Sequence, residues 1–127
     1  MTWYAVSAIL YFRYKDVERQ DEFYVWENVY LVHASGPEEA GRKAEALGRA
    51  EQTADPSMTL NERPAELVFG GIRKVISCAA TISMPGSGLV EQVHDGMEAT
   101  YSGFTVGSRE ALDALIAGDP VTVRYEE

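Results

Sequence analysis

Cysteine and basic residues are scarce in this chain, and each shortage narrows the functions open to it. Cys78 is the only cysteine, so no internal disulfide can form and nothing indicates an oxidising compartment. Lysine and arginine number 11 against 20 acidic residues, which gives a net charge of -9. This surplus repels nucleic-acid phosphates and anionic lipids, so we expect neither a nucleic acid nor a membrane as partner.

Long hydrophobic runs are missing as well. The opening stretch MTWYAVSAILYF has no positively charged start and is too short to cross a bilayer, so we expect a cytoplasmic protein. The composition, 46% hydrophobic and 24% charged, is ordinary for a folded protein. The length of 127 residues predicts a single domain over residues 1–127.

Side chains that bind metals or nucleotides are few and badly spaced for either task. His33, His94 and Cys78 lie far apart, with no C-x-x-C or H-x-x-x-H spacing, so we expect no metal. The stretches FGGIRK and PGSG lack the spacing of phosphate-binding loops, so we expect no cofactor. Cys78 sits in the apolar run VISCAATIS, which predicts a buried and unreactive thiol.

Periodicity and turn residues predict an α+β fold. Alternating apolar residues predict strands over residues 3–14, 23–34, 66–84, 89–93, 97–106 and 121–125. Capping residues and apolar spacing predict helices that begin at Ser35 and Ser108, with Gly118 ending the second. The expected order is β-β-α-β-β-β-α-β, in one mostly antiparallel sheet of about five to six strands with both helices packed on one face. Gly70–Gly71 predicts a bulge, and residues 77–93 fit one bent strand or two.

Aromatic residues concentrate in the first predicted hairpin, which holds nine of the chain's 13. Tyr24, Trp26 and Tyr30 share one face of its second strand by their even spacing. The opposite face, with Val25, Val29 and Leu31, would suffice to pack against the helices. A contiguous aromatic row in water needs a cover, so these three residues predict a binding surface for a protein partner or a second copy of the chain, a homodimer. The polar loop at residues 53–65 is a further candidate cover.

His94 and Asp95 are the only acid–base candidates that adjoin in the sequence. Histidine titrates near neutral pH, and a carboxylate can orient it. Adjacent strand residues point to opposite faces, however, and Asp95-Gly96 is the dipeptide typical of a tight type I′ hairpin turn. The pattern therefore favours a turn over a catalytic pair.

Several short stretches resemble the bacterial domain-of-unknown-function family 4288. They are WYAVSAILYF, EFYVWENVYLVHASGPEEAGRKAEALGRA, FGGIRKV and DGMEATYSGFTV. The resemblance implies a single compact domain. It implies no settled activity and no catalytic residues, so no residue role carries over from it.

The leading functional hypothesis is a non-enzymatic module that binds a protein partner or itself. A domain that binds a small molecule in an aromatic pocket is the alternative. An immunity-like inhibitor of a basic toxin rests on the acidic charge alone. An enzyme that uses His94 ranks last.

Overall fold

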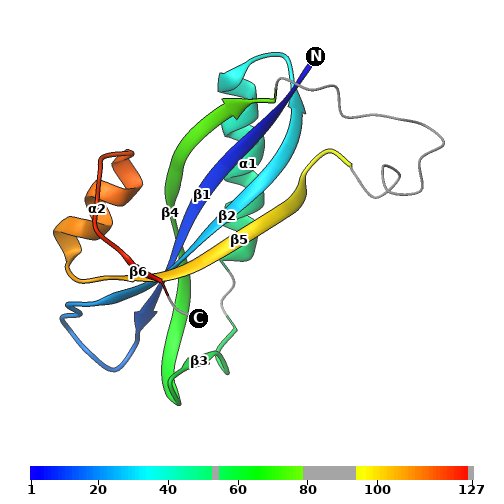
Figure 1. The fold of residues 1–127 in the computed structure, drawn as a ribbon. Helices are drawn as coiled ribbons and strands as arrows, with labels where there is room; N and C mark the ends of the chain where they lie inside the picture. The colour runs from blue at the N-terminus through cyan, green and yellow to red at the C-terminus, as the bar shows by residue number, and fades with distance from the viewer. Residues whose placement is uncertain (53–54, 79–93, 126–127) are drawn as a thin grey trace.

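The computed structural model describes residues 1–52, 55–78 and 94–125 of the chain. Its helices and strands are β1 (Thr2–Tyr14), β2 (Phe23–Ala34), α1 (Pro37–Glu51), β3 (Thr59–Leu60), β4 (Arg63–Ser77), β5 (Met97–Val106), α2 (Arg109–Ala117) and β6 (Arg124–Tyr125). The predicted α+β class is confirmed (Figure 1). The strands predicted over residues 66–84 and 89–93 differ in detail, since β4 begins earlier and residues 79–93 lie outside the described part.

The strands form one sheet in the order β3-β4-β1-β2-β5-β6, and every neighbouring pair is antiparallel. The predicted hairpin of β1 and β2 is confirmed, with Tyr11 opposite Val25 and Thr2 opposite Ala34. β1 therefore lies inside the sheet, between its hairpin partner and β4. This position explains its sequence, because a central strand is covered on both faces and needs apolar side chains on both.

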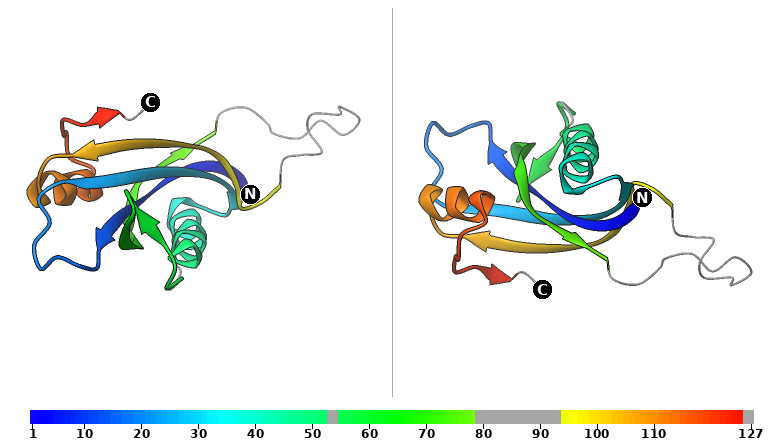
Figure 2. Two further views of the ribbon diagram at one scale, coloured as in Figure 1. Left: turned by 90° about the horizontal axis from the view of Figure 1, so that it is seen from below. Right: turned by 90° about the horizontal axis from the view of Figure 1, so that it is seen from above.

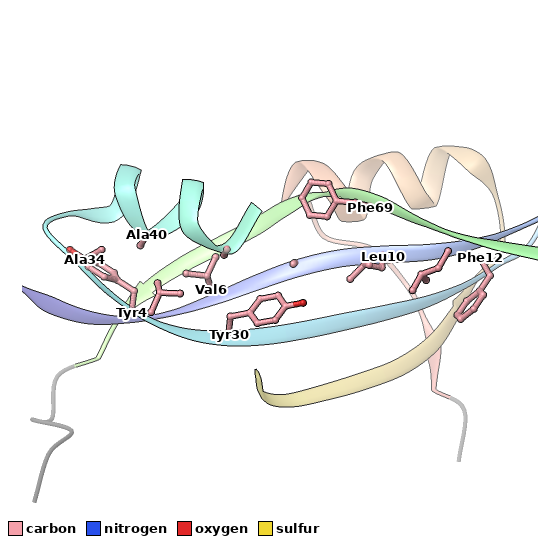
Figure 3. Close-up of a cluster of buried hydrophobic side chains, with 12 residues drawn as sticks. Tyr4, Val6, Leu10, Phe12, Tyr30, Ala34, Ala40 and Phe69 are labelled. Carbon is pink, nitrogen blue, oxygen red and sulfur yellow. The ribbon is translucent and has the colours of Figure 1, made fainter. Parts of the chain in front are cut away.

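The two helices cover opposite faces of the sheet, so the prediction that both pack on one face is wrong. Even-numbered side chains of β1, such as Val6 and Leu10, belong to a buried cluster with Ala40 of α1 (Figure 3). Odd-numbered ones, such as Ile9, belong to a second cluster with Leu112 of α2. Successive strand residues point to opposite faces, so each helix has its own core. The views in Figure 2 show the helices well apart along the twisted sheet.

Helix α1 packs closely on the sheet because its buried stripe is made of small residues. Ala40, Ala44 and Gly48 are its buried positions. A Cβ atom at Gly48 would lie 2.6 Å from the ring of Phe69 on β4, so only glycine permits this approach. The predicted cap at Ser35 is wrong by one residue. Gly36 is the N-cap, because Pro37 already occupies the first turn.

Helix α2 is held at both ends as its sequence predicts. The Ser108 hydroxyl accepts a hydrogen bond from the Ala111 amide at 3.0 Å, and Gly118 ends the helix with φ +87°.

The register of β1 and β4 shifts twice, which leaves Gly70 and Arg73 unpaired with β1 and confirms the predicted bulge. The Arg73 guanidinium donates to the Leu115 carbonyl, so the bulged strand also holds the carboxyl end of α2.

Candidate interaction surface

Three aromatic side chains form a partly exposed surface on the face of the sheet that α1 covers in part. Tyr24 and Trp26 come from β2 and Tyr101 from β5, and we call these three residues the aromatic surface. The Trp26 ring meets the Phe12 ring edge-on, with 4.9 Å between their centroids. The centroid of the Tyr101 ring lies 6.3 Å from that of Trp26. Tyr24 stacks on Phe12 at 5.5 Å. Phe12 is buried beneath them, while Tyr101 is 61% exposed. The surface is therefore anchored on the core and open to solvent.

Tyr30 does not belong to this surface, although its spacing from Trp26 suggested it. It is only 3% exposed and lies in the cluster beneath α1 (Figure 3), opposite Val6 of β1. Asn28 donates a hydrogen bond to its hydroxyl at 3.4 Å. Burial raises the pKa of Tyr30, and the nearby carboxylates of Glu51 and Glu98 raise it further. The alternation of strand residues places Tyr24, Trp26 and Tyr30 on one face of β2. It does not show which of them α1 covers, because that depends on where the helix ends.

The opposite face of β2 also differs from its prediction. Val25 is fully buried in the cluster with α2. Val29 and Leu31 are only partly buried, so they do not form a core with either helix. α2 is only nine residues long, and its buried residues Leu112 and Leu115 share a cluster with Val25 but not with Val29 or Leu31.

The chain itself covers one border of the aromatic surface. Met58 and Leu60 pack against the same buried cluster as Tyr24 and Trp26, and Leu60 lines a hollow together with Tyr24, so part of the polar loop 53–65 acts as a cover. The side-chain amide of Asn61 donates to the Tyr14 hydroxyl at 2.9 Å and fixes the loop to β1. A hollow of about 350 Å³ remains there. Its lining residues are Tyr14, Glu22, Tyr24, Leu60, Asn61, Thr105 and Arg124.

Gly103 of β5 makes room for Tyr24. A Cβ atom at this position would lie 2.5 Å from the Tyr24 hydroxyl oxygen, so the tyrosine extends across the neighbouring strand only because glycine is there. Neither Gly103 nor Tyr101 was identified from the sequence. A glycine inside a strand pattern was the available signal, because it often marks the close approach of another group.

Two carboxylates, those of Glu51 and Glu98, lie near enough to Tyr30 to raise its pKa. Glu98 of β5 lies opposite Tyr30 of β2, and Glu51 is the last residue of α1. Partial burial raises the pKa of Glu98, and the charge of Glu51 adds to this effect. The pair therefore places negative charge near Tyr30.

His94 and Asp95 do not form an acid–base pair. The Asp95 carboxylate accepts a hydrogen bond from the backbone amide of His33 at 2.8 Å and forms an ion pair with Lys43. The Lys43 ammonium and then the His33 amide lower the pKa of Asp95. His94 is exposed, and its Nδ1 lies 3.3 Å from the Asp95 backbone oxygen rather than from its carboxylate. Asp95 thus joins the end of β2 to α1.

The Asp95-Gly96 turn is present, but its type differs from the prediction. The Met97 amide donates to the His94 carbonyl at 3.2 Å, which closes the turn. Gly96 has φ +89° whereas Asp95 has no positive φ, and these signs fit type II rather than type I′. The Gly96 amide donates to the Leu31 carbonyl, so the turn leads into β5 beside β2. The partner strand predicted at 89–93 lies outside the described residues.

The remaining candidates do not assemble into a site. Cys78 is partly exposed rather than buried, and it directly follows the last residue of β4. The His33 ring stacks on the Trp3 ring with 4.9 Å between the ring centroids, and the Cys78 amide donates to the Trp3 carbonyl at 2.8 Å. Among the described residues, no three histidine, cysteine or acidic side chains come together as a metal site. In the same part of the chain, no helix has both the length and the apolar character needed to cross a membrane.

Comparison with known proteins gives one match. The model of a family described as a domain of unknown function, DUF4288, matches residues 3–89. No curated protein and no solved structure matches the chain. The matched range contains Tyr24 and Trp26 of the aromatic surface but ends before Tyr101.

Proposed function

The chain belongs to the DUF4288 family, to which no activity is assigned, and we propose from its surface that it is a non-enzymatic protein-interaction module. The single observation that carries this proposal is the aromatic surface of Tyr24, Trp26 and Tyr101. These side chains have an apolar body and a polar end, and such residues dominate the binding energy of protein interfaces. Tyr24 and Trp26 pack on buried Phe12, which holds these two rings in place before a partner arrives and so lowers the entropic cost of binding.

A second candidate function, binding of a small molecule, is favoured by the hollow between Tyr14 and Tyr24. Its volume of about 350 Å³ lies at the lower end of the range found for ligand pockets, roughly 300–1,000 Å³. The two functions depend on different residues. A small ligand would contact Asn61 at the rim of the hollow, whereas a protein partner would also need Tyr101.

The decisive experiment compares captured proteins between matched variants. The chain and its Trp26→Ala/Tyr101→Ala variant are used as baits in a lysate of the native host, with mass spectrometry as the readout. Tyr125→Ala is the control, because Tyr125 is 66% exposed, much as Tyr101 is, but packs on Phe104 of the other core. We expect a partner that the control retains and the double variant loses. Equal capture by both variants would contradict the proposal.

Sedimentation of the purified chain tests whether the partner is a second copy. A dimer that dissociates in the double variant and persists in Tyr125→Ala would identify self-association. A ligand that binds the double variant but not Asn61→Ala would instead favour the small-molecule function.

A further inference from the structure

The hollow beside Tyr14 and Tyr24 brings an acidic and a basic side chain together. Its lining also includes Glu22, directly before β2, and Arg124 of β6. The nearest atoms of the Arg124 guanidinium and the Glu22 carboxylate lie 3.9 Å apart, and both side chains are exposed. An exposed ion pair contributes little to stability, so a ligand with charges of its own can share these two groups at small cost.

Strand pairing places Arg124 on the same side of the sheet as the tyrosine. Tyr24 of β2 lies opposite Thr105 of β5, and Thr105 lies opposite Arg124 of β6. Side chains of residues directly opposite one another in antiparallel strands project from the same face. All three line the hollow, so this row of residues forms one of its walls.

The Tyr14 wall of the hollow is fixed by its own contacts. The Arg63 guanidinium lies 3.9 Å from the centre of the Tyr14 ring, and Asp16 accepts a hydrogen bond from Arg63 at 2.9 Å. Asn61 donates to the Tyr14 hydroxyl at 2.9 Å. A hydroxyl that accepts one hydrogen bond can still donate its own proton, so Tyr14 can offer a donor to a ligand. A wall that is already in place lowers the cost of ordering on binding.

The backbone that carries Asn61 is strained. Asn61 and Glu62 have φ +53° and +64°, and they are the two central residues of the turn in which Leu60 pairs with Arg63. Such a turn favours asparagine in the first position but glycine in the second, so Glu62 is strained there. Backbone strain concentrates at functional sites, where the surrounding structure maintains it. Here the strained turn holds Leu60 and Asn61 against the hollow.

The two charges of the hollow select a class of ligand. A simple anion would meet a like charge at Glu22, and a simple cation would meet one at Arg124. A free α-amino acid carries an ammonium and a carboxylate on one carbon atom, so it can contact two opposite charges that lie 3.9 Å apart. Tyr14, Tyr24 and Leu60 supply aromatic and apolar area for its side chain.

We propose that the hollow binds a free α-amino acid with an aromatic or other large apolar side chain. Its carboxylate contacts the Arg124 guanidinium and the Tyr14 hydroxyl, and its ammonium contacts the Glu22 carboxylate. Its side chain lies against Tyr24 and Leu60. This inference rests on the second function proposed above, small-molecule binding, since it names the class of ligand for the same hollow.

The test measures binding of L-phenylalanine and two derivatives to the intact chain by isothermal titration calorimetry. N-acetyl-L-phenylalanine lacks the ammonium charge, and L-phenylalanine amide lacks the carboxylate. We expect each derivative to bind at least about tenfold more weakly than L-phenylalanine, because each loses one of the two charge contacts. L-glutamate should bind at least about tenfold more weakly too, because its side chain brings a charge to the apolar wall.

Variants of the two charged residues identify which ligand group each one contacts. Glu22→Gln and Arg124→Gln should each weaken L-phenylalanine binding about tenfold. Glu22→Gln should leave the acetylated derivative within about twofold, and Arg124→Gln the amide, because the group that each side chain contacts is already missing. Glu45→Gln is the matched control, since it removes a charge from the exposed pair with Arg49 on α1, and it should bind L-phenylalanine within about twofold of the wild type. Circular dichroism checks that every variant keeps the fold.

Three results would overturn the amino-acid site. They are no L-phenylalanine binding at concentrations up to about 10 mM, equal binding of the derivatives, and an equal loss in Glu45→Gln and Glu22→Gln.

Further measurements separate this inference from the functions beneath it. Suppose that L-phenylalanine does not bind but a member of a small-molecule library shifts the Asn61 amide resonance. The small-molecule function would then stand with another class of ligand. If no member shifts it, that function fails as well. The capture experiment with Trp26→Ala/Tyr101→Ala tests the interaction module independently, because the described lining of the hollow includes neither residue.

Discussion

Individual residues in this chain often act through partners that are distant in the sequence. Asp95 is the clearest case, because its carboxylate contacts the His33 amide and the Lys43 ammonium. Sequence reasoning correctly placed Asp95 in a turn, since Asp-Gly is a local signal. It could not find the two contacts, because they depend on where α1 and β2 lie in the folded chain.

Replacing Asp95 with asparagine should destabilise the fold in a pH-dependent way. Asparagine keeps an acceptor for the His33 amide but loses the ion pair, so we expect a loss of about 0.5–1 kcal/mol at pH 7. The pKa of Asp95 is lowered in the folded state, so its contribution is complete above the usual value of 3.8 and is lost as the pH falls through the folded value. Urea unfolding of both proteins at several pH values measures this. A stability gap that stays constant down to pH 3 would contradict the assignment.

At the scale of elements, capping signals were predictable and close packing was not. Ser108 and Gly118 end α2 as their sequence indicated, because caps act over a few residues. Gly48 of α1 permits contact with Phe69 of β4, and no local pattern reveals that it is this ring that lies against the helix.

Two glycine substitutions in α1 should have opposite effects. Gly48→Ala should lower the free energy of unfolding by about 1–3 kcal/mol, because its Cβ collides with the buried ring of Phe69. Gly41→Ala should raise it by up to about 1 kcal/mol, because alanine favours the helix and its Cβ meets only Val75 at 4.0 Å. Thermal or chemical unfolding compares them. Equal effects of the two changes would show that Gly48 is not a packing residue.

Removing the side-chain cap of α2 should lower the free energy of unfolding more than removing the serine before α1. Ser108→Ala removes the acceptor for the Ala111 amide and should destabilise by about 1 kcal/mol. Ser35→Ala serves as the comparison, since Ser35 is exposed and its hydroxyl donates to the Glu39 carboxylate rather than capping α1. Denaturant midpoints of the two variants give the difference. A larger loss for Ser35→Ala would reverse the assignment of the caps.

At the scale of the whole molecule, two cores share one sheet. The class, the first hairpin and the antiparallel sheet were predictable, because they depend on local alternation and turns. The distribution of the helices was not, because β1 is apolar on both faces and the sequence does not say which helix covers which. Tyr30 was misplaced for the same reason, since its exposure depends on α1.

The two cores should unfold together. Leu10→Ala on the α1 face and Leu112→Ala on the α2 face should each cost about 2–5 kcal/mol, since both side chains are fully buried. Each variant should unfold in a single transition, at a lower midpoint than the wild type, and circular dichroism and tryptophan fluorescence should give the same midpoint. The reason is that β1 contributes side chains to both clusters. Separate transitions in either variant would mean that the chain does not fold as one domain.

The inner position of β1 also has a consequence for the rate of folding. Its pairing with β2 joins neighbouring segments, but its pairing with β4 spans the whole of α1, with Tyr4 opposite Ser77. Closing that long loop costs chain entropy before the contacts of either core repay it. The hairpin of β1 and β2 is therefore the natural nucleus. The docking of β4, which completes contacts with both helices, is the step we expect to limit the speed of folding.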